Sequence, residues 1–240
     1  MGVTINIDTE MKEKCYYFAA AIVLSKNQFK RFPNEDIIDR IERTFAGKLG
    51  EYVFLKYLEN KKLINQDEKA QILDEMFKIF DGQHKVDSYD FKTKGNKRID
   101  IKTAYKTFHS NLVVNKDQFE DIEKQKDYYI AVKLKLNTDD FINLTDELQD
   151  ESNNKYANKI LKTKNEDKDY TVDNLIYEKK QVLSIKGIKE AEICGYISRA
   201  DLNKLTYNNG NQYGYLSKAY CKYISLYKLN DIEEIIKKFE

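Results

Sequence analysis

The chain has 240 residues, of which 41% are hydrophobic and 34% are charged. This composition supplies enough apolar material for the core of one large domain and excludes an intrinsically disordered chain. The formal net charge of +1 excludes a uniformly basic nucleic-acid binder, so any surface for a polyanion must be a local patch.

Residues that form disulfides or bind soft metals are few and scattered. The three cysteines are Cys15, Cys194 and Cys221, and the two histidines are His84 and His109. No CxxC pair exists, which argues against a structural zinc site and against a disulfide framework. We therefore expect a reducing, cytoplasmic location.

The first third of the chain predicts helices. Apolar residues at helical spacing indicate helices over residues 10–29, 34–60 and 67–80. The first of these contains the apolar run 18–24, which is short and has no cleavage site after it, so a buried helix is favoured over a signal peptide. No stretch is long enough to span a membrane, and we expect no membrane partner.

The rest of the chain alternates strands and helices. Residues 89–93 and 97–104 predict a hairpin around Lys94-Gly95-Asn96. Further along, we expect helices over 115–125 and 230–239 and strands over 128–136, 181–185, 191–198 and 221–229. This order predicts a single mixed α/β domain over residues 1–240.

Residues 137–180 are polar, weakly periodic and predicted to be an insertion within that domain. Six acidic residues and no basic ones lie between Lys135 and Lys155, so this segment should face away from a polyanion. A solvated, mobile loop accounts for the same pattern at least as well as a functional role.

The sharpest chemical pattern is the segment Arg98-Ile99-Asp100-Ile101-Lys102. Side chains of a strand alternate between its two faces, so Asp100 and Lys102 share one face, ~7 Å apart. Ile99 and Ile101 share the other face and should anchor the strand in the core. The simpler interpretation is an ordinary ion pair on an edge strand.

The preceding strand decides whether this segment is a site. If the loop is the three residues 94–96, Phe91 pairs with Ile99 and Asp90 lies opposite Asp100, with Cβ atoms ~5 Å apart. Two carboxylates at that distance call for a cation or a proton between them. A two-residue loop would separate them, and Asp87 is an alternative to Asp90; Asp90 could also be a plain turn residue.

Glu51 lies in the predicted second helix, flanked by the glycines Gly47 and Gly50. Each glycine inside a helix costs up to ~1 kcal/mol relative to alanine, which close approach of another chain segment would justify. A glutamate on this helix could reach a metal ion held by the hairpin. Alternatively, Glu51 is a surface charge or a partner for Lys48.

A Glu on an early helix, an Asp near a strand start and Asp-x-Lys on the next strand together resemble the PD-(D/E)XK nuclease superfamily. The resemblance covers residues 34–135 and implies a restriction-endonuclease-like αβββαβ core, with a central mixed sheet flanked by helices. It departs from the motif at Tyr89, where the family has proline. The resemblance implies hydrolysis of phosphodiesters with Mg²⁺, for which Mn²⁺ is the expected substitute.

The resemblance also implies roles for individual residues. Asp90 and Asp100 would bind the metal ion together with the Ile101 carbonyl, and Glu51 would hold a metal-bound water or a second ion. Lys102 would position the attacking water and stabilise charge on the phosphate. Gln118 resembles a glutamine of some members, although a plain surface residue is the simpler interpretation.

The segment from Lys85 to Lys106, both included, has seven basic residues and three acidic ones, a pattern that suits a phosphate backbone or simply a solvated hairpin. The leading hypothesis is a type II restriction or defence endonuclease that cuts double-stranded DNA as a homodimer, with no nucleotide cofactor. A junction-resolvase-like repair nuclease and a non-catalytic nucleic-acid-binding module are the alternatives.

Overall fold

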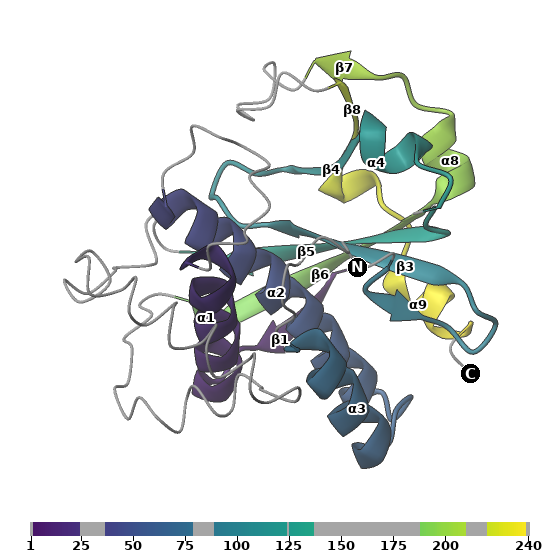
Figure 1. Cartoon of the computed structure of the whole chain (residues 1–240). Coiled ribbons are helices and arrows are strands. Elements are labelled where there is room, and N and C mark those ends of the chain that lie inside the picture. The colour runs from purple at the N-terminus through teal and green to yellow at the C-terminus, as the bar shows by residue number, and fades with distance from the viewer. Residues whose placement is uncertain are drawn as a thin grey trace.

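The computed structural model describes residues 2–24, 37–78, 89–123, 125–136, 188–209 and 220–238. It shows a mixed α/β arrangement built on two sheets (Figure 1). The five-stranded sheet has the order β1 (Val3–Asn6), β6 (Glu190–Ser198), β5 (Tyr128–Lys135), β3 (Arg98–Ala104) and β2 (Phe91–Lys92). Its β3–β5 pairing is parallel and its other pairings are antiparallel, so the expected mixed sheet is confirmed.

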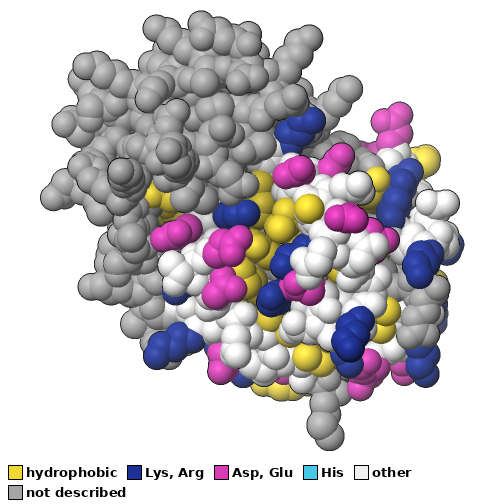
Figure 2. Space-filling model, turned by 90° about the horizontal axis from the view of Figure 1, so that it is seen from below, with side chains coloured by type: hydrophobic (Ala, Val, Ile, Leu, Met, Phe, Trp, Pro, Cys, Tyr) yellow, Lys and Arg dark blue, Asp and Glu magenta, His cyan; other side chains and the backbone are white. Residues whose placement is uncertain are grey.

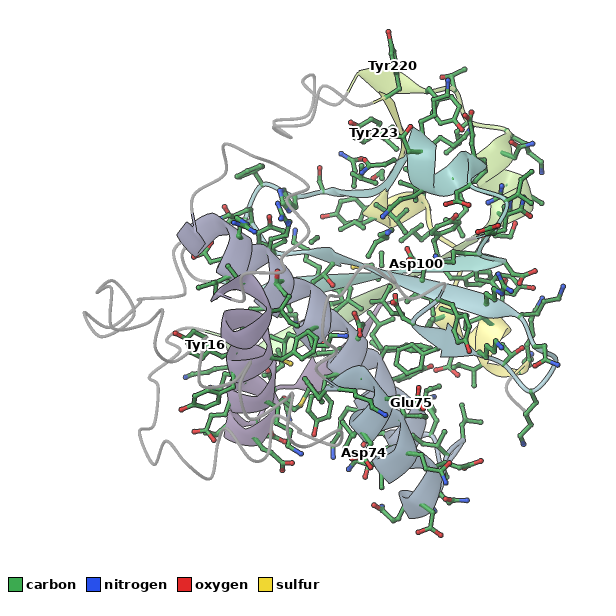
Figure 3. The ribbon with its side chains drawn as sticks, in the orientation of Figure 1. Tyr16, Asp74, Glu75, Asp100, Tyr220 and Tyr223 are labelled. Atoms are coloured by element: carbon green, nitrogen blue, oxygen red, sulfur yellow. The ribbon has the colours of Figure 1, made fainter. Side chains whose placement is uncertain are left out.

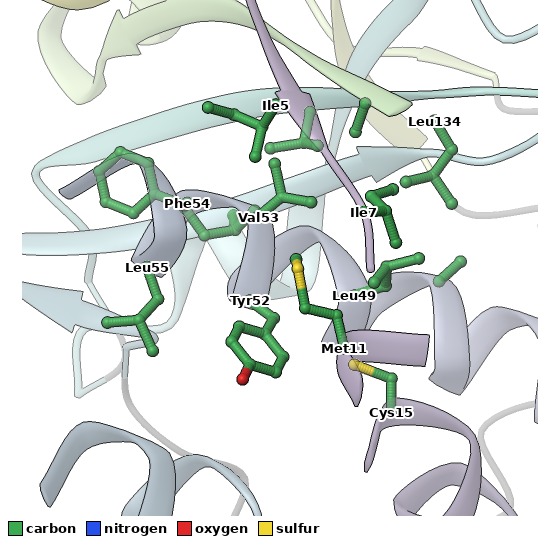
Figure 4. Close-up of a cluster of buried hydrophobic side chains, with 14 of the residues drawn as sticks. Ile5, Ile7, Met11, Cys15, Leu49, Tyr52, Val53, Phe54, Leu55 and Leu134 are labelled. Carbon is green, nitrogen blue, oxygen red and sulfur yellow. The ribbon is translucent and has the colours of Figure 1, made fainter. Parts of the chain in front are cut away.

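Helices cover one face of this sheet. They are α1 (Thr9–Leu24), α2 (Ile37–Asn60), α3 (Gln66–Met76) and α9 (Ile232–Ile236). Figure 4 shows part of the core between them and the sheet, where Met11 of α1 and Leu49 and Val53 of α2 lie near Leu134 of β5. The apolar run at residues 18–24 belongs to α1, and Phe18 and Val23 are buried as expected.

The opposite face of the sheet carries a second, smaller core. It contains the three-stranded sheet β4 (Asn111–Asn115), β8 (Tyr220–Ser225) and β7 (Asn208–Asn209), the helices α4 (Lys116–Glu120) and α8 (Arg199–Asn203), and the 3-10 turn η2 (Leu226–Lys228). Strand β5, within the predicted strand 128–136, separates the two cores by alternation. Ile130 and Val132 pack toward the helices, whereas Tyr129 and Ala131 pack toward α4.

The chain order α2-α3-β2-β3-β4-α4-β5 places three strands between α3 and α4, but β4 pairs with β8 in the second sheet. Strands β1, β4 and β7 and helix α8 were not predicted from the sequence. Helix α4 is much shorter than the predicted 115–125. The predicted insertion at 137–180 and the strand at 181–185 lie outside the described residues.

Helix α2 ends where its sequence predicts. The Leu63 N–H donates to Leu58 O (3.0 Å) and the Lys62 N–H donates to Glu59 O (2.9 Å). Lys62 adopts a left-handed φ of 58°, which completes a Schellman motif. Across the described ranges, no helix is both long and apolar enough to cross a membrane.

The two glycines of α2 have different surroundings. A Cβ at Gly50 would overlap Oγ1 of Thr103 and crowd the Cβ and Cγ2 of that residue. A Cβ at Gly47 would meet nothing within 4 Å. Gly50 therefore permits the close approach of α2 to β3, the strand that carries Asp100. Packing does not explain Gly47.

This difference predicts opposite effects for two matched substitutions in one helix. Gly50→Ala should destabilise the fold by ~1–3 kcal/mol because the added methyl overpacks the contact with Thr103. Gly47→Ala should stabilise it by up to ~1 kcal/mol because only helix propensity changes. Urea unfolding of both variants measures this. Equal effects at the two positions would contradict the proposed close approach.

Candidate active site

The hairpin that carries the candidate residues has the register predicted for a three-residue loop. Phe91 pairs with Ile99 and Lys92 with Arg98. The Thr93 N–H donates to Lys97 O (3.0 Å), and Asn96 takes the left-handed φ of 58° that closes such loops. Asp90 is thus the residue directly before β2, beside the Asp100 segment of β3.

Asp90 is bonded to the backbone on both sides of Asp100. Its N–H donates to Ile99 O (2.9 Å), and its Oδ2 accepts from the Ile101 N–H (2.6 Å). Strand β2 begins only at Phe91, so no backbone carbonyl of β2 reaches the Ile101 N–H. The carboxylate of Asp90 accepts that hydrogen bond instead. Asp90 is therefore held at the fork where the two strands part.

Asp100 and Lys102 point away from the helical core, as their alternation predicts. Ile99 and Ile101 are buried in that core, 0% and 8% exposed. Lys102 Nζ lies 2.6 Å from Asp100 Oδ2 and donates to Gln118 Oε1 at 3.3 Å. Figure 3 shows Asp100 at the level of the five-stranded sheet. Gln118 thus contacts the site, contrary to the simpler surface interpretation.

A lysine that was not predicted completes the surroundings of Asp100. Lys126 lies just before β5, its side chain is 10% exposed, and its Nζ is 3.9 Å from Asp100 Oδ1. The parallel pairing of β3 with β5 produces this contact, because it aligns Asp100 with Tyr129. No local spacing in the sequence could have indicated it.

Glu51 enters the same electrostatic cluster from α2. It forms a 2.6 Å ion pair with Lys48, and both side chains are largely buried, 17% and 13% exposed. The expectation of a Lys48 partner is therefore confirmed, yet Glu51 is no solvated surface charge. Its negative charge also acts on Asp90, which links the helix to the hairpin.

The crowding of acids is strongest at Asp90. Burial, followed by repulsion from Glu51 and Asp100, raises the pKa of Asp90 well above its usual range, despite the hydrogen bond from Ile101. At Lys48, burial alone would lower the pKa of the ammonium, but attraction to Glu51 and Asp90 outweighs burial and raises that pKa. Each group thus depends on charges from another element.

The donor types at this site fit a hard divalent cation, because Asp90 and Asp100 offer carboxylate oxygens. Asp100 Oδ2 is buried and accepts no hydrogen bond from the described residues, although Lys102 Nζ forms an ion pair with it. Glu51, however, is drawn toward Lys48. Within the part of the chain that is described, no three acidic, His or Cys side chains converge as a metal-binding group.

Arg199 and Lys222 hold α4, the helix that brings Gln118 to Lys102. The Arg199 guanidinium stacks 4.2 Å from the Phe119 ring and donates to Phe119 O (2.6 Å), and Lys222 Nζ lies 5.0 Å from the same ring. A five-residue helix is marginal by itself. Residues of α8 and β8 therefore hold Gln118 in place.

Two of the basic residues around the hairpin form ion pairs with acids, and a third donates to a backbone oxygen. Lys97 pairs with Asp127, Arg98 donates to Glu123 O, and Lys106 pairs with the buried Glu42. Figure 2 likewise shows a face on which basic and acidic side chains are interspersed. Lys85 and Asp87 lie outside the described residues.

Comparisons with protein-family models, with curated proteins and with solved structures find no match to this chain. The resemblance to the PD-(D/E)XK superfamily therefore depends on the residues of the hairpin and α2.

The raised pKa of Asp90 predicts a pH dependence of stability in metal-free buffer. Between the unfolded pKa of about 4 and the higher folded value, the folded state binds more protons, so stability falls as pH rises. Asp90→Asn keeps an acceptor for the Ile101 N–H and lacks this titration. We expect it to exceed the wild type in unfolding free energy at pH 8, and the difference to shrink toward pH 4.

Urea unfolding at several pH values in the presence of EDTA measures this difference. Asp74→Asn, an exposed change on α3 (Figure 3), serves as the control and should show no such trend. If the unfolding free energies of Asp90→Asn and the wild type differ by the same amount at all pH values, the carboxylates do not raise the pKa of Asp90 as proposed.

Proposed function

We propose that this protein is a Mg²⁺-dependent endonuclease that hydrolyses DNA phosphodiester bonds, as a restriction or defence enzyme of the PD-(D/E)XK class. The observation that carries the proposal is the fork between β2 and β3. There Asp90, Asp100 and Lys102 meet, and the charge of Glu51 reaches them from α2. Two acids and a lysine at a strand fork, with the charge of a third acid acting on them, suit a site for a cation and a phosphate.

Each residue has a role that follows from its surroundings. Asp90 and Asp100 present oxygens to the ion, and the Ile101 carbonyl would be a further ligand. The bound Mg²⁺ would supply Lewis-acid stabilisation and lower the pKa of water. Lys102 lies between Asp100 and Gln118, a position that suits a residue that orients water and stabilises phosphate charge better than a base.

Glu51 would have different partners in the metal-free and metal-bound protein. In the metal-free protein it is paired with Lys48. Under the proposal, Glu51 turns from Lys48 toward a metal-bound water or a second ion. Mn²⁺, which also takes oxygen ligands, should replace Mg²⁺.

Double-stranded DNA is the proposed substrate, and a homodimer is the proposed assembly, because two-fold symmetry matches that of a duplex. Because Lys97 and Lys106 are already held in ion pairs, fewer lysines around the hairpin are available to contact the phosphate backbone. Cleavage of branched DNA alone would instead favour a junction-resolvase-like enzyme. Binding without cleavage would favour a non-catalytic module.

Two substitutions separate metal binding from the role of the lysine. Asp100→Asn should abolish Mg²⁺-dependent nicking of supercoiled plasmid and tight metal binding, because it removes an anionic oxygen. Lys102→Ala should abolish nicking but bind metal as tightly as the wild type or slightly more tightly, because a nearby positive charge is lost. Calorimetric metal titration and plasmid cleavage measure both properties.

Asp74→Asn and Lys135→Ala are the matched controls. Asp74 is exposed on α3, and Lys135 pairs with Glu190 at the exposed end of β5. Circular dichroism must show that each variant is folded. Wild-type cleavage by Lys102→Ala would make that residue a bystander, and normal cleavage by both site variants would eliminate the proposed nuclease site.

A further inference from the structure

Lys126 is a buried cation of the site to which the proposed chemistry gives no role. Only 9% of the residue is exposed, and its Nζ lies 3.9 Å from Asp100 Oδ1. The Nζ of Lys102 lies 2.6 Å from Oδ2, the other oxygen of the same carboxylate. Because burying an ammonium group is costly without compensation, two lysines around one aspartate require an explanation.

The backbone beside Lys126 is fixed more firmly than a loop usually is. The neighbouring Asp127 exchanges hydrogen bonds with Arg98: the Asp127 N–H donates to Arg98 O (2.8 Å), and the Arg98 N–H donates to Asp127 Oδ2 (2.9 Å). The Arg199 N–H in turn donates to Asp127 O (2.8 Å). The main chain at Lys126 is thus tied to β3 and to α8, which gives its ammonium a defined position next to Asp100.

The charges of the site explain why such a lysine would be useful. When all three acids are ionised, as they would be around a bound cation, the charges of Lys48, Lys102 and Lys126 balance those of Glu51, Asp90 and Asp100. With a divalent ion bound, the positive charges exceed the negative ones by two. A phosphodiester together with an attacking hydroxide carries the same charge with opposite sign. Without Lys126 the excess would be only one.

We propose that Lys126 is a phosphate-binding residue of this site, which donates to a non-bridging oxygen of the phosphodiester under attack. The proposal rests on the proposed nuclease function and adds a second lysine to it. Lys102 and Lys126 approach Asp100 from opposite oxygens. They would therefore contact the phosphate from two directions and fix its orientation for in-line attack.

The test compares Lys126→Gln and Lys126→Arg with the control Lys135→Gln, which removes an exposed lysine from the far end of β5. Single-turnover plasmid cleavage with Mg²⁺ gives the rate of the chemical step, and Mn²⁺ titration by calorimetry without DNA gives metal affinity. We expect Lys126→Gln to slow cleavage ~100-fold, the usual effect of losing one donor to a developing anion. Lys126→Arg should recover much of the rate, and Lys135→Gln should match the wild type.

Metal binding distinguishes a phosphate contact from a structural role. Lys126→Gln should bind Mn²⁺ at least as tightly as the wild type, because it removes a positive charge near Asp100. Weaker Mn²⁺ binding, or no rescue by arginine, would mean that Lys126 only supports the fold of the site and would overturn the inference. If the wild type cleaves and Lys126→Gln cleaves equally fast, only the inference about Lys126 fails. If the wild type cleaves no DNA, the nuclease proposal fails and this inference with it.

Discussion

The arrangement of the site depends on keeping several buried carboxylates next to one another. Asp90, Asp100 and Glu51 come from three different elements, and their mutual repulsion adds to the cost of burying Asp90. The fold offsets this cost with the lysines at Glu51 and Asp100 and with the Ile101 N–H at Asp90. Each acid thus has a compensating group of its own.

The same constraint explains the main features of the fold around the site. Strand β2 must be short so that the Asp90 side chain, and not another backbone, satisfies Ile101. Helix α2 must approach β3 closely for Glu51 to act on Asp90, and Gly50 permits that approach against Thr103. The apolar face of β3, through Ile99 and Ile101, keeps the strand fixed while its polar face carries the charges.

Local patterns were enough to predict the parts of the structure that depend on neighbours in sequence. The alternation around Asp100, the loop at 94–96 and the end of α2 at Asn60 are all determined within a few residues. Strand β1 and the contact of Lys126 with Asp100 depend instead on partners more than twenty residues away in the chain. Strand β4 has an apolar centre, but it is only five residues long and pairs with β8 more than a hundred residues away, so its local pattern is a weak signal.

The dependence of α4 on Arg199 and Lys222 has a consequence for the order in which the site is completed during synthesis. Glu51, Asp90, Asp100 and Lys102 all leave the ribosome well before Arg199 and Lys222, which hold the Phe119 end of α4. A nascent chain that has exposed all four residues therefore still lacks the elements that bring Gln118 to Lys102. The arrangement around Lys102 is completed only when β8 has docked, so a segment made more than a hundred residues later positions a side chain at a site encoded before it.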